Sequence, residues 1–492
     1  MYSVNTKKQS ARVIISEAIM FIAVIVTVVI LVLLVSGYWL NENLQVERNG
    51  MLQISSFPTG ADVEIDGETS SWLERTNSSK ILSSGEHSVT LTKDGYDSWS
   101  KTINISEGLL YRLHYPRLFL NQREISPVLD TAKYTSATIS ANHNVALLIN
   151  NTTEWAYLNL DADDLKPRSL DISKIFTTTP ATDADSSAPG LFTGTILQAD
   201  WDVDASHVLF QVKNDDAIEW VLLDVDNIDK SINLTREFGA NFSRIEILDN
   251  NSNNLLAIQD HNLRKIDISS RLISAILVEN VFDFDHYHNE IVFSTTNNAN
   301  TASTSDTTSI TDTAHSVDAA DSINTVGYFK LGDSNLTKLT TTATPAKVAI
   351  SKFYDSKYIT IIEGQNISVH PKDSFNEPDS VSKYTLTFTP ESVEVGHGGE
   401  FLLLTAGHQL ATLDMEAKLT LEWTIENDFG WLDQDMLYTV ADGELIVYDF
   451  DGLNRRVLAH DVSGNFPVAI TSDKWLYYFS NHNLVREWLI SR

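Results

Sequence analysis

The chain contains no cysteine among its 492 residues. This absence excludes disulfide bonds, thiolate metal sites, cysteine nucleophiles and a lipid anchor on an N-terminal cysteine. Stability must therefore come from the burial of apolar surface, and a chain of this length can bury enough of it.

Basic residues are scarce as well. Lys and Arg number 35 against 66 Asp and Glu, which gives a formal net charge of −31. The first 17 residues carry +2, so the remainder carries −33. A surface this negative repels nucleic acid and anionic lipid headgroups. We therefore set aside a nucleic-acid role and expect cations or basic surfaces as the easier partners.

The sequence motifs of common catalytic sites are missing. There is no Gly-x-Ser-x-Gly, no His-Glu-x-x-His, no phosphate-binding glycine loop and no sialidase-type aspartate box. We predict no catalytic residues and no cofactor. A general acid and base could still occur among the many acidic residues, but the sequence alone does not select the pair.

One long apolar run is present. Residues 18–40 carry no charge over 23 positions. A helix of that length reaches about 34 Å, enough to cross a hydrocarbon core of about 30 Å. Lys7, Lys8 and Arg12 precede the run and acidic residues follow it, which predicts a cytoplasmic N-terminus.

These features predict a protein with one membrane span. We expect a cytoplasmic tail at 1–17, a transmembrane helix at 18–40 and a linker at 41–50, with the rest of the chain extracytoplasmic. A secretory signal cleaved near Val35-Ser36-Gly37 is the alternative. An exported chain without thiols fits a bacterial plasma membrane and cell envelope.

Residues 51–118 alternate apolar and polar positions in short runs between turn signals. Asp66-Gly67 and Asp94-Gly95 are typical of tight turns, and the pattern predicts a small antiparallel β-sandwich. The segment also contains a set of turn and strand residues that occur together in one family: Pro58, Gly60, Ala61, Val63, Ile65, Asp66, Gly67, Leu82, Gly85, His87, Val89, Leu91, Gly95 and Tyr96. On these residues it resembles the PEGA domain, with Thr59 in place of the glutamate of the Pro-Glu-Gly-Ala turn. The resemblance implies a compact β-module of bacterial envelope proteins, without catalysis.

Residues 119–492 repeat one pattern: an apolar strand, a polar turn, a strongly apolar strand, another turn and a third strand. Spacings of about 40 to 50 residues are typical of four-stranded propeller blades. We predict a mainly β fold with a seven- or eight-bladed β-propeller, eight preferred. It resembles periplasmic Tol-type and Trp-Asp repeat propellers in architecture only. The repeats begin near Thr138, Ile196, Arg244, Val281, Lys347, Ser392, Phe429 and Val468.

Two spacings are longer than a blade requires. The stretches near 176–195 and 296–325 are rich in Thr, Ser, Asn, Asp and Ala, so they are expected to be mobile insertions. The last repeat lacks a fourth strand. We predict that residues 122–129 supply the outer strand of the final blade.

Three groups of polar residues suggest metal ligands, but each has a simpler explanation. Asp200, Asp202 and Asp204 alternate as in a calcium loop, and so do Asp249, Asn251 and Asn253. Both groups fall at turns, where Asp and Asn are favoured for turn chemistry. His286 and His288 also alternate, without a third ligand. We predict turn structure and no metal site.

The tryptophans of the exported part suit either sugar stacking or packing between blades, and we favour packing. Taken together, the sequence predicts a membrane-anchored extracytoplasmic binding or scaffold protein of a bacterial envelope, whose propeller engages a protein or a polysaccharide. The alternative is an envelope glycan hydrolase or lyase with carboxylates in the propeller funnel.

Overall fold

The computed structural model divides the chain into two compact units, Met1–Arg123 with Ile490–Arg492, and Glu124–Leu489. The predicted insertions near 176–195 and 296–325 lie mostly outside the described residues. The structure describes residues 6–35, 38–40, 46–69, 75–176, 191–248, 251–296, 324–333, 335–396 and 398–490.

The first unit begins with helix α1 (Thr6–Val35). The side chains described within it, those of residues 16–32, are all exposed. The predicted helix extended to Leu40, but Tyr38–Leu40 instead form strand β1, which pairs with β2 (Val46–Arg48). The sequence reason is that Ser36-Gly37, outside the described residues, consists of poor helix formers. No helix in the described part of the chain combines the length and apolar character that a bilayer crossing demands.

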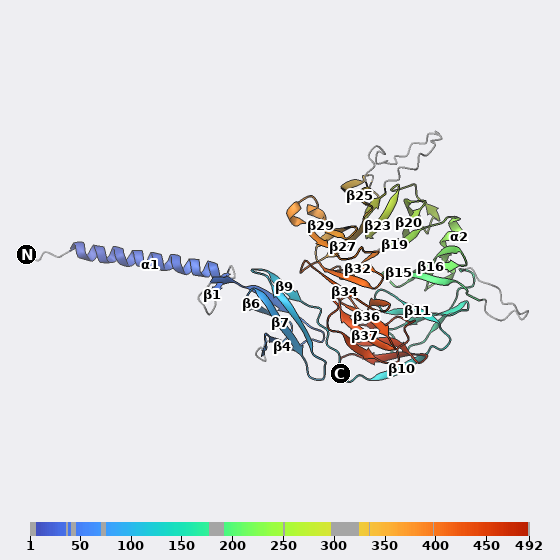
Figure 1. Ribbon diagram of the computed structural model, residues 1–492, viewed down its shortest axis with the longest axis horizontal. Helices are drawn as coiled ribbons and strands as arrows, with labels where there is room; N and C mark the ends of the chain where they lie inside the picture. Colours follow the sequence, from blue (N-terminus) through green and yellow to red (C-terminus); the bar gives the residue numbers. More distant parts are fainter. Residues whose placement is uncertain are drawn as a thin grey trace, which may run out of the picture. The chain divides into compact units, whose positions relative to one another are not determined.

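Two small sheets follow in the first unit, with strand orders β6-β3-β9 and β5-β4-β7-β8 (Figure 1). Apolar and polar residues alternate along β3, β7 and β8, which leaves Leu52, Val89 and Trp99 with no exposed surface. The strands are β3 (Gly50–Ile54), β4 (Asp62–Ile65), β5 (Glu68–Thr69), β6 (Ser78–Leu82), β7 (Gly85–Thr92), β8 (Trp99–Ile105) and β9 (Leu110–Leu113).

The pairing in this module corrects the expectation of purely antiparallel strands. Strand β3 pairs with β6 in antiparallel and with β9 in parallel orientation, Met51 lying opposite Leu110. The reason is that β9 follows β8, a strand of the other sheet, so the chain crosses between the sheets before it returns beside β3.

The second unit consists of four-stranded antiparallel sheets that follow one another around the unit in chain order (Figure 1). Eight such sheets are formed by its described residues. The first four contain β11 (Ser136–Ile139), β12 (Val145–Ile149), β13 (Glu154–Asn159), β14 (Arg168–Asp171); β15 (Thr195–Trp201), β16 (His207–Asn214), β17 (Ala217–Asp224), β18 (Ile232–Asn233); β19 (Arg244–Leu248), β20 (Asn251–Gln259), β21 (Asn262–Asp267), β22 (Leu272–Ile273); and β23 (Val281–Tyr287), β24 (Glu290–Thr295), β25 (Asn324–Lys330), β26 (Thr337–Thr342).

The other four sheets have the same arrangement, and a few short helices lie in the connections. The sheets contain β27 (Lys347–Phe353), β28 (Ser356–Glu363), β29 (Asn366–Pro371), β30 (Ser382–Thr385); β31 (Ser392–Val395), β32 (Phe401–Ala406), β33 (Gln409–Asp414), β34 (Leu419–Thr424); β35 (Phe429–Trp431), β36 (Met436–Ala441), β37 (Glu444–Asp449), β38 (Arg456–Ala459); and β39 (Ala469–Thr471), β40 (Trp475–Ser480), β41 (Asn483–Trp488), β10 (Ile125–Asp130). The helices are η1 (Ile228–Lys230), α2 (Leu234–Phe238), η2 (Lys372–Ser374) and η3 (Pro378–Ser380).

The predicted repeat starts coincide with the first strands of these sheets, namely β11, β15, β19, β23, β27, β31, β35 and β39; Val468 lies one residue before its strand. The predicted closing strand is also confirmed. Strand β10 pairs with β41, with Ile125 opposite Glu487 and Asp130 opposite Asn483, and completes the last sheet at its outer edge. The start and the end of the second unit are thus joined in one sheet.

The core of the second unit lies between neighbouring sheets. Trp155 and Trp220 are each 1% exposed, which confirms a packing role for both. The ring of Trp155 lies 5.0 Å from that of Phe176 and 5.6 Å from that of Phe210, a residue of the next sheet. Contacts of this kind between sheets bury the apolar second strands on both faces.

Candidate functional site

The first strands of five sheets surround a cavity of about 780 Å³. Residues from β15, β19, β23, β27 and β31 line it, together with short stretches beside β31. We call this space the inner cavity. Because first strands of successive sheets approach one another here, residues far apart in the sequence meet in one place.

Four acidic residues occupy the same place in their repeats. Each lies opposite a fully buried Leu or Val of the neighbouring second strand: Asp200 opposite Leu209, Glu246 opposite Leu256, Asp285 opposite Val292 and Glu394 opposite Leu403. In the sheet between those of Asp285 and Glu394, Ile350 takes this position. We call Asp200, Glu246, Asp285 and Glu394 the acidic ring.

Burial and mutual repulsion weaken the acidity of ring members. Burial raises the pKa of Asp200 to about 6, helped by the negative charge of Glu246, although the Gln198 amide donates a hydrogen bond to its Oδ2 over 2.5 Å. Burial also raises the pKa of Glu394, and the charge of Asp200 adds to the rise. Since three sheets separate β15 from β31 along the chain, this repulsion acts across the inner cavity.

Asp285 is the most strongly perturbed ring residue. Burial raises its pKa to about 7, and the negative charge of Glu246 contributes to the rise. Its carboxylate accepts hydrogen bonds from the backbone N–H of Ile350 at 2.7 Å and of His286 at 2.8 Å. These donors hold the side chain in place and only partly offset the unfavourable burial of its charge.

One arginine lies among the carboxylates. The Arg244 guanidinium forms salt bridges with Glu246 and Asp283, and the other oxygen of Asp283 accepts from the backbone N–H of Val348 at 2.8 Å. Burial alone would lower the pKa of Arg244, but the two carboxylates raise it above its ordinary value. The network links β19, β23 and β27 and neutralises part of the acidic charge.

The histidine pair suggested by the sequence does not form one site. His286 is directed toward Glu246, with 3.6 Å between Nε2 and a carboxylate oxygen, and its side chain is 7% exposed. His288 lies in the following turn, where it is exposed and its ring is 4.3 Å from that of Tyr287. The two imidazoles therefore do not converge on a common ligand.

The first aspartate group serves different purposes at its three positions. Asp200 belongs to the acidic ring, and Asp204 is exposed. Asp202 accepts hydrogen bonds from the backbone N–H of Ser206 at 2.8 Å and of His207 at 2.9 Å. The turn interpretation is thus confirmed for Asp202. In the second group, Asp249 lies outside the described residues, and Asn251 and Asn253 belong to β20.

His207 extends this turn toward a second cavity, of about 460 Å³, at the boundary between the sheets of β15 and β19. Its Nδ1 lies 2.9 Å from Asp202 Oδ2, and the hydrogen bond to Asp202 raises its pKa despite partial burial. Ser206 Oγ contacts the same Nδ1 and the same carboxylate, at 2.8 Å each. Because Ser206 and Asp202 share one imidazole nitrogen, they do not form a nucleophile–base–acid relay.

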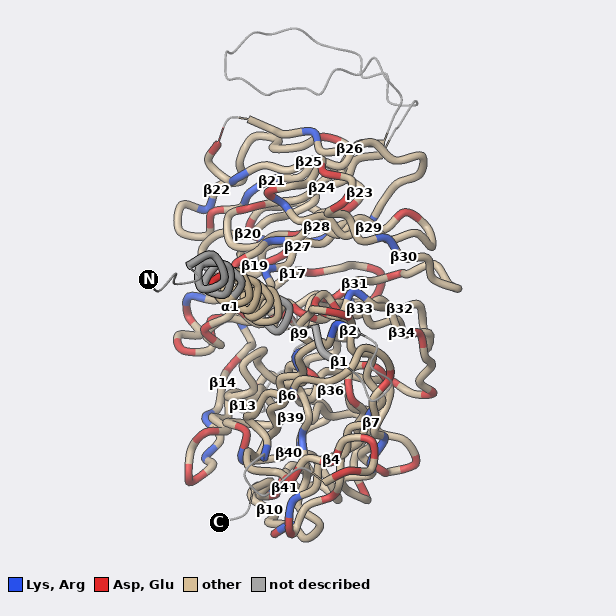
Figure 2. Tube along the Cα trace, turned by 90° about the vertical axis from the view of Figure 1, so that its left-hand side faces the viewer, with Lys and Arg blue, Asp and Glu red and all other residues tan. Residues whose placement is uncertain are grey.

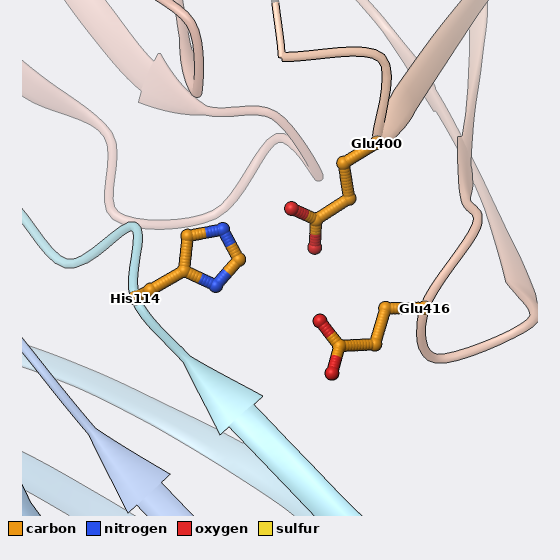
Figure 3. A group of neighbouring side chains, drawn as sticks. All are labelled: His114, Glu400 and Glu416. Atoms are coloured by element: carbon orange, nitrogen blue, oxygen red, sulfur yellow. The ribbon is translucent and has the colours of Figure 1, made fainter. Parts of the chain in front are cut away.

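Another carboxylate pair is formed by Glu400 and Glu416 (Figure 3). Glu400 precedes β32 and is 6% exposed, and Glu416 lies in the turn between β33 and β34. Their nearest carboxylate oxygens lie within 4.8 Å of each other. The hydrogen bond from the Met415 N–H to the Glu400 carbonyl, 3.0 Å long, holds the two segments together. His114, also drawn in Figure 3, belongs to the first unit.

Sequence reasoning missed the acidic ring as a unit. From the sequence, Asp200 was considered only as part of a turn motif and Arg244 only as the start of a repeat, and Asp285, Glu246 and Glu394 were not singled out. The signal was available, because an acidic residue recurs at one position of four repeats. Only alignment of the repeats against their second strands reveals it.

Comparison with known proteins identifies one module. Residues 49–117 match the PEGA domain, which confirms the resemblance found in the sequence. No curated protein matches the chain.

The chain also matches several solved structures at low identity. The C-terminal WD40 domain of Sif2 is 9% identical and covers 75% of this chain and 99% of its own, with a TM-score of 0.43. The β-propeller domain of Cps50 (Swd1) from Myceliophteria thermophila is 10% identical. The match covers 75% of this chain and 100% of that domain, with a TM-score of 0.38. An oligogalacturonate lyase in complex with manganese is 12% identical. The match covers 59% of this chain and 88% of the lyase chain, with a TM-score of 0.38. The chain is thus mainly β, with a PEGA domain and repeated four-stranded sheets of a propeller-like kind.

Proposed function

We propose that the protein is a membrane-anchored extracytoplasmic scaffold of a bacterial envelope. In this proposal the apolar part of α1, residues 18–35, crosses the plasma membrane, the PEGA domain is a spacer or docking unit, and the eight sheets form an eight-bladed propeller. The propeller binds a partner protein or a polysaccharide. The chain needs no catalytic residue or cofactor for this role.

The uneven distribution of charge carries the proposal. The first unit contains 12 basic and 12 acidic residues, whereas the second contains 23 basic and 54 acidic residues. Figure 2 shows acidic positions spread over the propeller sheets. All of the net charge of −31 thus belongs to the propeller. A body with this potential attracts basic surfaces and speeds their association at low ionic strength.

The anchor is supported by the apolar helix. Ile19, Phe21 and Leu31 are 62%, 68% and 53% exposed, and the charge-free sequence continues to Leu40. Exposed apolar side chains on a whole helix surface are costly in water and stable in lipid. A signal peptide cleaved near Val35-Ser36-Gly37 is the alternative use of the same residues.

Membrane anchoring can be tested with two introduced charges. The variant Ile25→Glu/Val29→Glu places carboxylates on one face of the apolar run, where each costs about 3 kcal/mol in a bilayer. We expect wild-type protein in the alkaline-extracted membrane fraction and the variant in the supernatant. The control Gln9→Glu lies outside the run and should stay with the membrane. Wild-type protein in the supernatant would contradict the anchor, and a shortened N-terminus would indicate cleavage.

The scaffold role is tested by crosslinking the anchored protein in its own cells and identifying what is captured. We expect a partner with a basic contact surface, and its capture should fall as ionic strength rises. Recovery of no protein, together with retention of saccharide by the full chain, would reject the protein-scaffold version in favour of polysaccharide binding.

A second candidate function is hydrolysis or elimination on an envelope glycan. It is favoured by the inner cavity, in which Asp285 and Asp200 have pKa values near 7 and 6, suitable for general acid catalysis near neutral pH. The test is incubation of the full chain with envelope polysaccharides and measurement of new reducing ends or unsaturated products. Activity abolished in Asp285→Asn and retained in Asp163→Asn would establish it, whereas absence of turnover on all of them would reject it.

A further inference from the structure

Three apolar residues form a row across the exposed face of the sheet β6-β3-β9. Met51 in the central strand lies opposite Ile81 on one side and opposite Leu110 on the other. Residues opposite one another share a face, and Ile81, Met51 and Leu110 are 67%, 42% and 38% exposed. Single exposed apolar residues are common, but a contiguous group marks an interaction surface. We call Ile81, Met51 and Leu110 the apolar row.

The apolar row lies at the end of the sheet where the chain enters it. Strand β3 begins at Gly50, one residue before Met51. The turn after β8 is bonded to the same end, because the Gly108 N–H donates to the Asn49 carbonyl at 3.0 Å and the Met51 N–H to the Leu109 carbonyl at 2.9 Å. Leu109 is itself 62% exposed. It therefore adds a fourth apolar residue to this end of the PEGA domain.

The hairpin of β1 and β2 keeps this end close to helix α1. Tyr38 pairs with Arg48, so the hairpin loop between them adds almost no distance. Tyr38 follows Val35 by three residues, and Met51 follows Arg48 by three. At most about 3.6 Å per residue and about 5 Å across the ladder place Met51 within about 27 Å of the end of α1.

This short connection brings the row within reach of a bilayer. Residues 18–35 of α1 span about 27 Å, close to the thickness of a hydrocarbon core of about 30 Å, so Val35 lies near its boundary when the helix crosses. The polar row beside the apolar row suits contact with lipid headgroups and water. It consists of Ser79, Gln53 and Arg112.

Charge and size favour lipid over a second protein as the occupant. Without residues 1–17, the first unit contains 9 basic and 11 acidic residues, so it lacks the strong repulsion from anionic headgroups that the propeller has. Four side chains provide only part of the roughly 800 Å² per partner that a stable protein interface needs. A contact of this size is weak by itself, but a membrane tether raises its effective concentration.

We propose that the apolar row docks the PEGA domain on the outer lipid surface of the membrane that α1 crosses. Ile81, Met51, Leu110 and Leu109 enter the layer between the headgroups and the upper acyl chains. This inference rests on the proposed membrane anchor and deepens it, because it makes the PEGA domain a docking unit rather than a spacer and names lipid as its partner.

The test measures insertion of a fluorescent label at the apolar row. Because the chain has no cysteine, Ile81→Cys gives the full chain a single labelling site. In nanodiscs whose lipids carry bromine on the upper acyl chains, a nitrobenzoxadiazole label there should lose about half or more of its fluorescence relative to unbrominated lipids. The control Thr102→Cys labels an exposed position of β8 in the other sheet and should lose less than about a tenth.

A second comparison changes the row without moving the label. Met51→Ser/Leu110→Ser in the chain labelled at position 81 should reduce the quenching by about twofold or more, because apolar contact is removed. The matched control Leu272→Ser/Leu419→Ser replaces leucines of the propeller that are 64% and 37% exposed, and it should leave the quenching unchanged. Since all four residues are exposed, both variants should keep the urea midpoint of the parent.

The outcomes separate this inference from the anchor. Protein that is not retained by nanodiscs would overturn both. Retention with equal quenching at positions 81 and 102, or with an equal decrease in the row variant and its control, would overturn the docking alone. An unquenched label, together with a disulfide between two copies of the unlabelled Ile81→Cys variant, would assign the row to a second copy of the chain.

Discussion

Replacement of Asp200 by asparagine should stabilise the protein, although Asp200 lines the inner cavity. The pKa of Asp200 rises from 3.8 to about 6 on folding. Below the lower value the carboxyl is neutral in both states and has no effect. Between the two values the unfolded chain loses a proton that the folded chain retains, so stability falls as pH rises. Above about pH 6 the charged Asp200 side chain lowers the free energy of unfolding by its full amount.

The size of this cost follows from the shift. About two pKa units correspond to about 3 kcal/mol at pH 8, and to about half of that at pH 5. Asparagine keeps an oxygen for the hydrogen bond from Gln198 and never becomes charged. Because the side chain is partly exposed, we expect a gain of about 1–3 kcal/mol at pH 8.

The assay is urea unfolding of the full chain followed by tryptophan fluorescence, at about pH 5 and pH 8. Asp163→Asn, at an exposed position, serves as the control and should change stability by less than about 0.5 kcal/mol. A loss of stability in Asp200→Asn at pH 8, or a gain that does not shrink at pH 5, would refute the reasoning about burial and repulsion.

Other predictions concern the framework of the propeller. Trp155→Ala should lower the free energy of unfolding by about 3–5 kcal/mol, since the indole is fully enclosed, and Trp155→Phe should recover part of the loss in urea unfolding. Val485→Pro should cost about 3 kcal/mol or more, because β41 pairs on both edges; an unchanged urea midpoint would contradict the closure. Asp202→Ala should cost about 2–4 kcal/mol at neutral pH through the lost bonds from Ser206 and His207. Hydrogen bonds lower the pKa of Asp202 despite burial, so the stability of the wild type over this variant should decline as the pH is lowered through the acid range.

The repeats could be located from sequence because each second strand is buried on both faces. Leu209, Leu256 and Leu403 belong to uninterrupted apolar runs, and polar turns bound each run. Such a pattern depends on local residues alone. The closing strand was predictable for a related reason: the last repeat lacked one strand, and an unassigned segment preceded the first repeat.

The set of side chains that meet around the inner cavity could not be predicted in the same way. Arg244 pairs with Asp283, and Asp200 repels Glu394, because their strands meet around the cavity. The distance between two residues along the sequence does not reveal whether their strands meet in space. The parallel pairing of β3 with β9 was missed for the same reason, because hairpin signals predict only neighbouring strands. The end of α1 was missed because hydropathy does not distinguish a helix from an apolar strand such as Tyr38–Leu40.

The joining of β10 to β41 has a consequence for the order of folding. The two strands are separated by nearly the whole second unit, so their pairing has a high loop-closure entropy and a high contact order. Internal sheets can form during synthesis from adjacent segments, but the last sheet must wait for the final strand. Until then β10 has an unpaired edge, available to chaperones or to a neighbouring nascent chain, and this interval is where misassembly through strand exchange would begin.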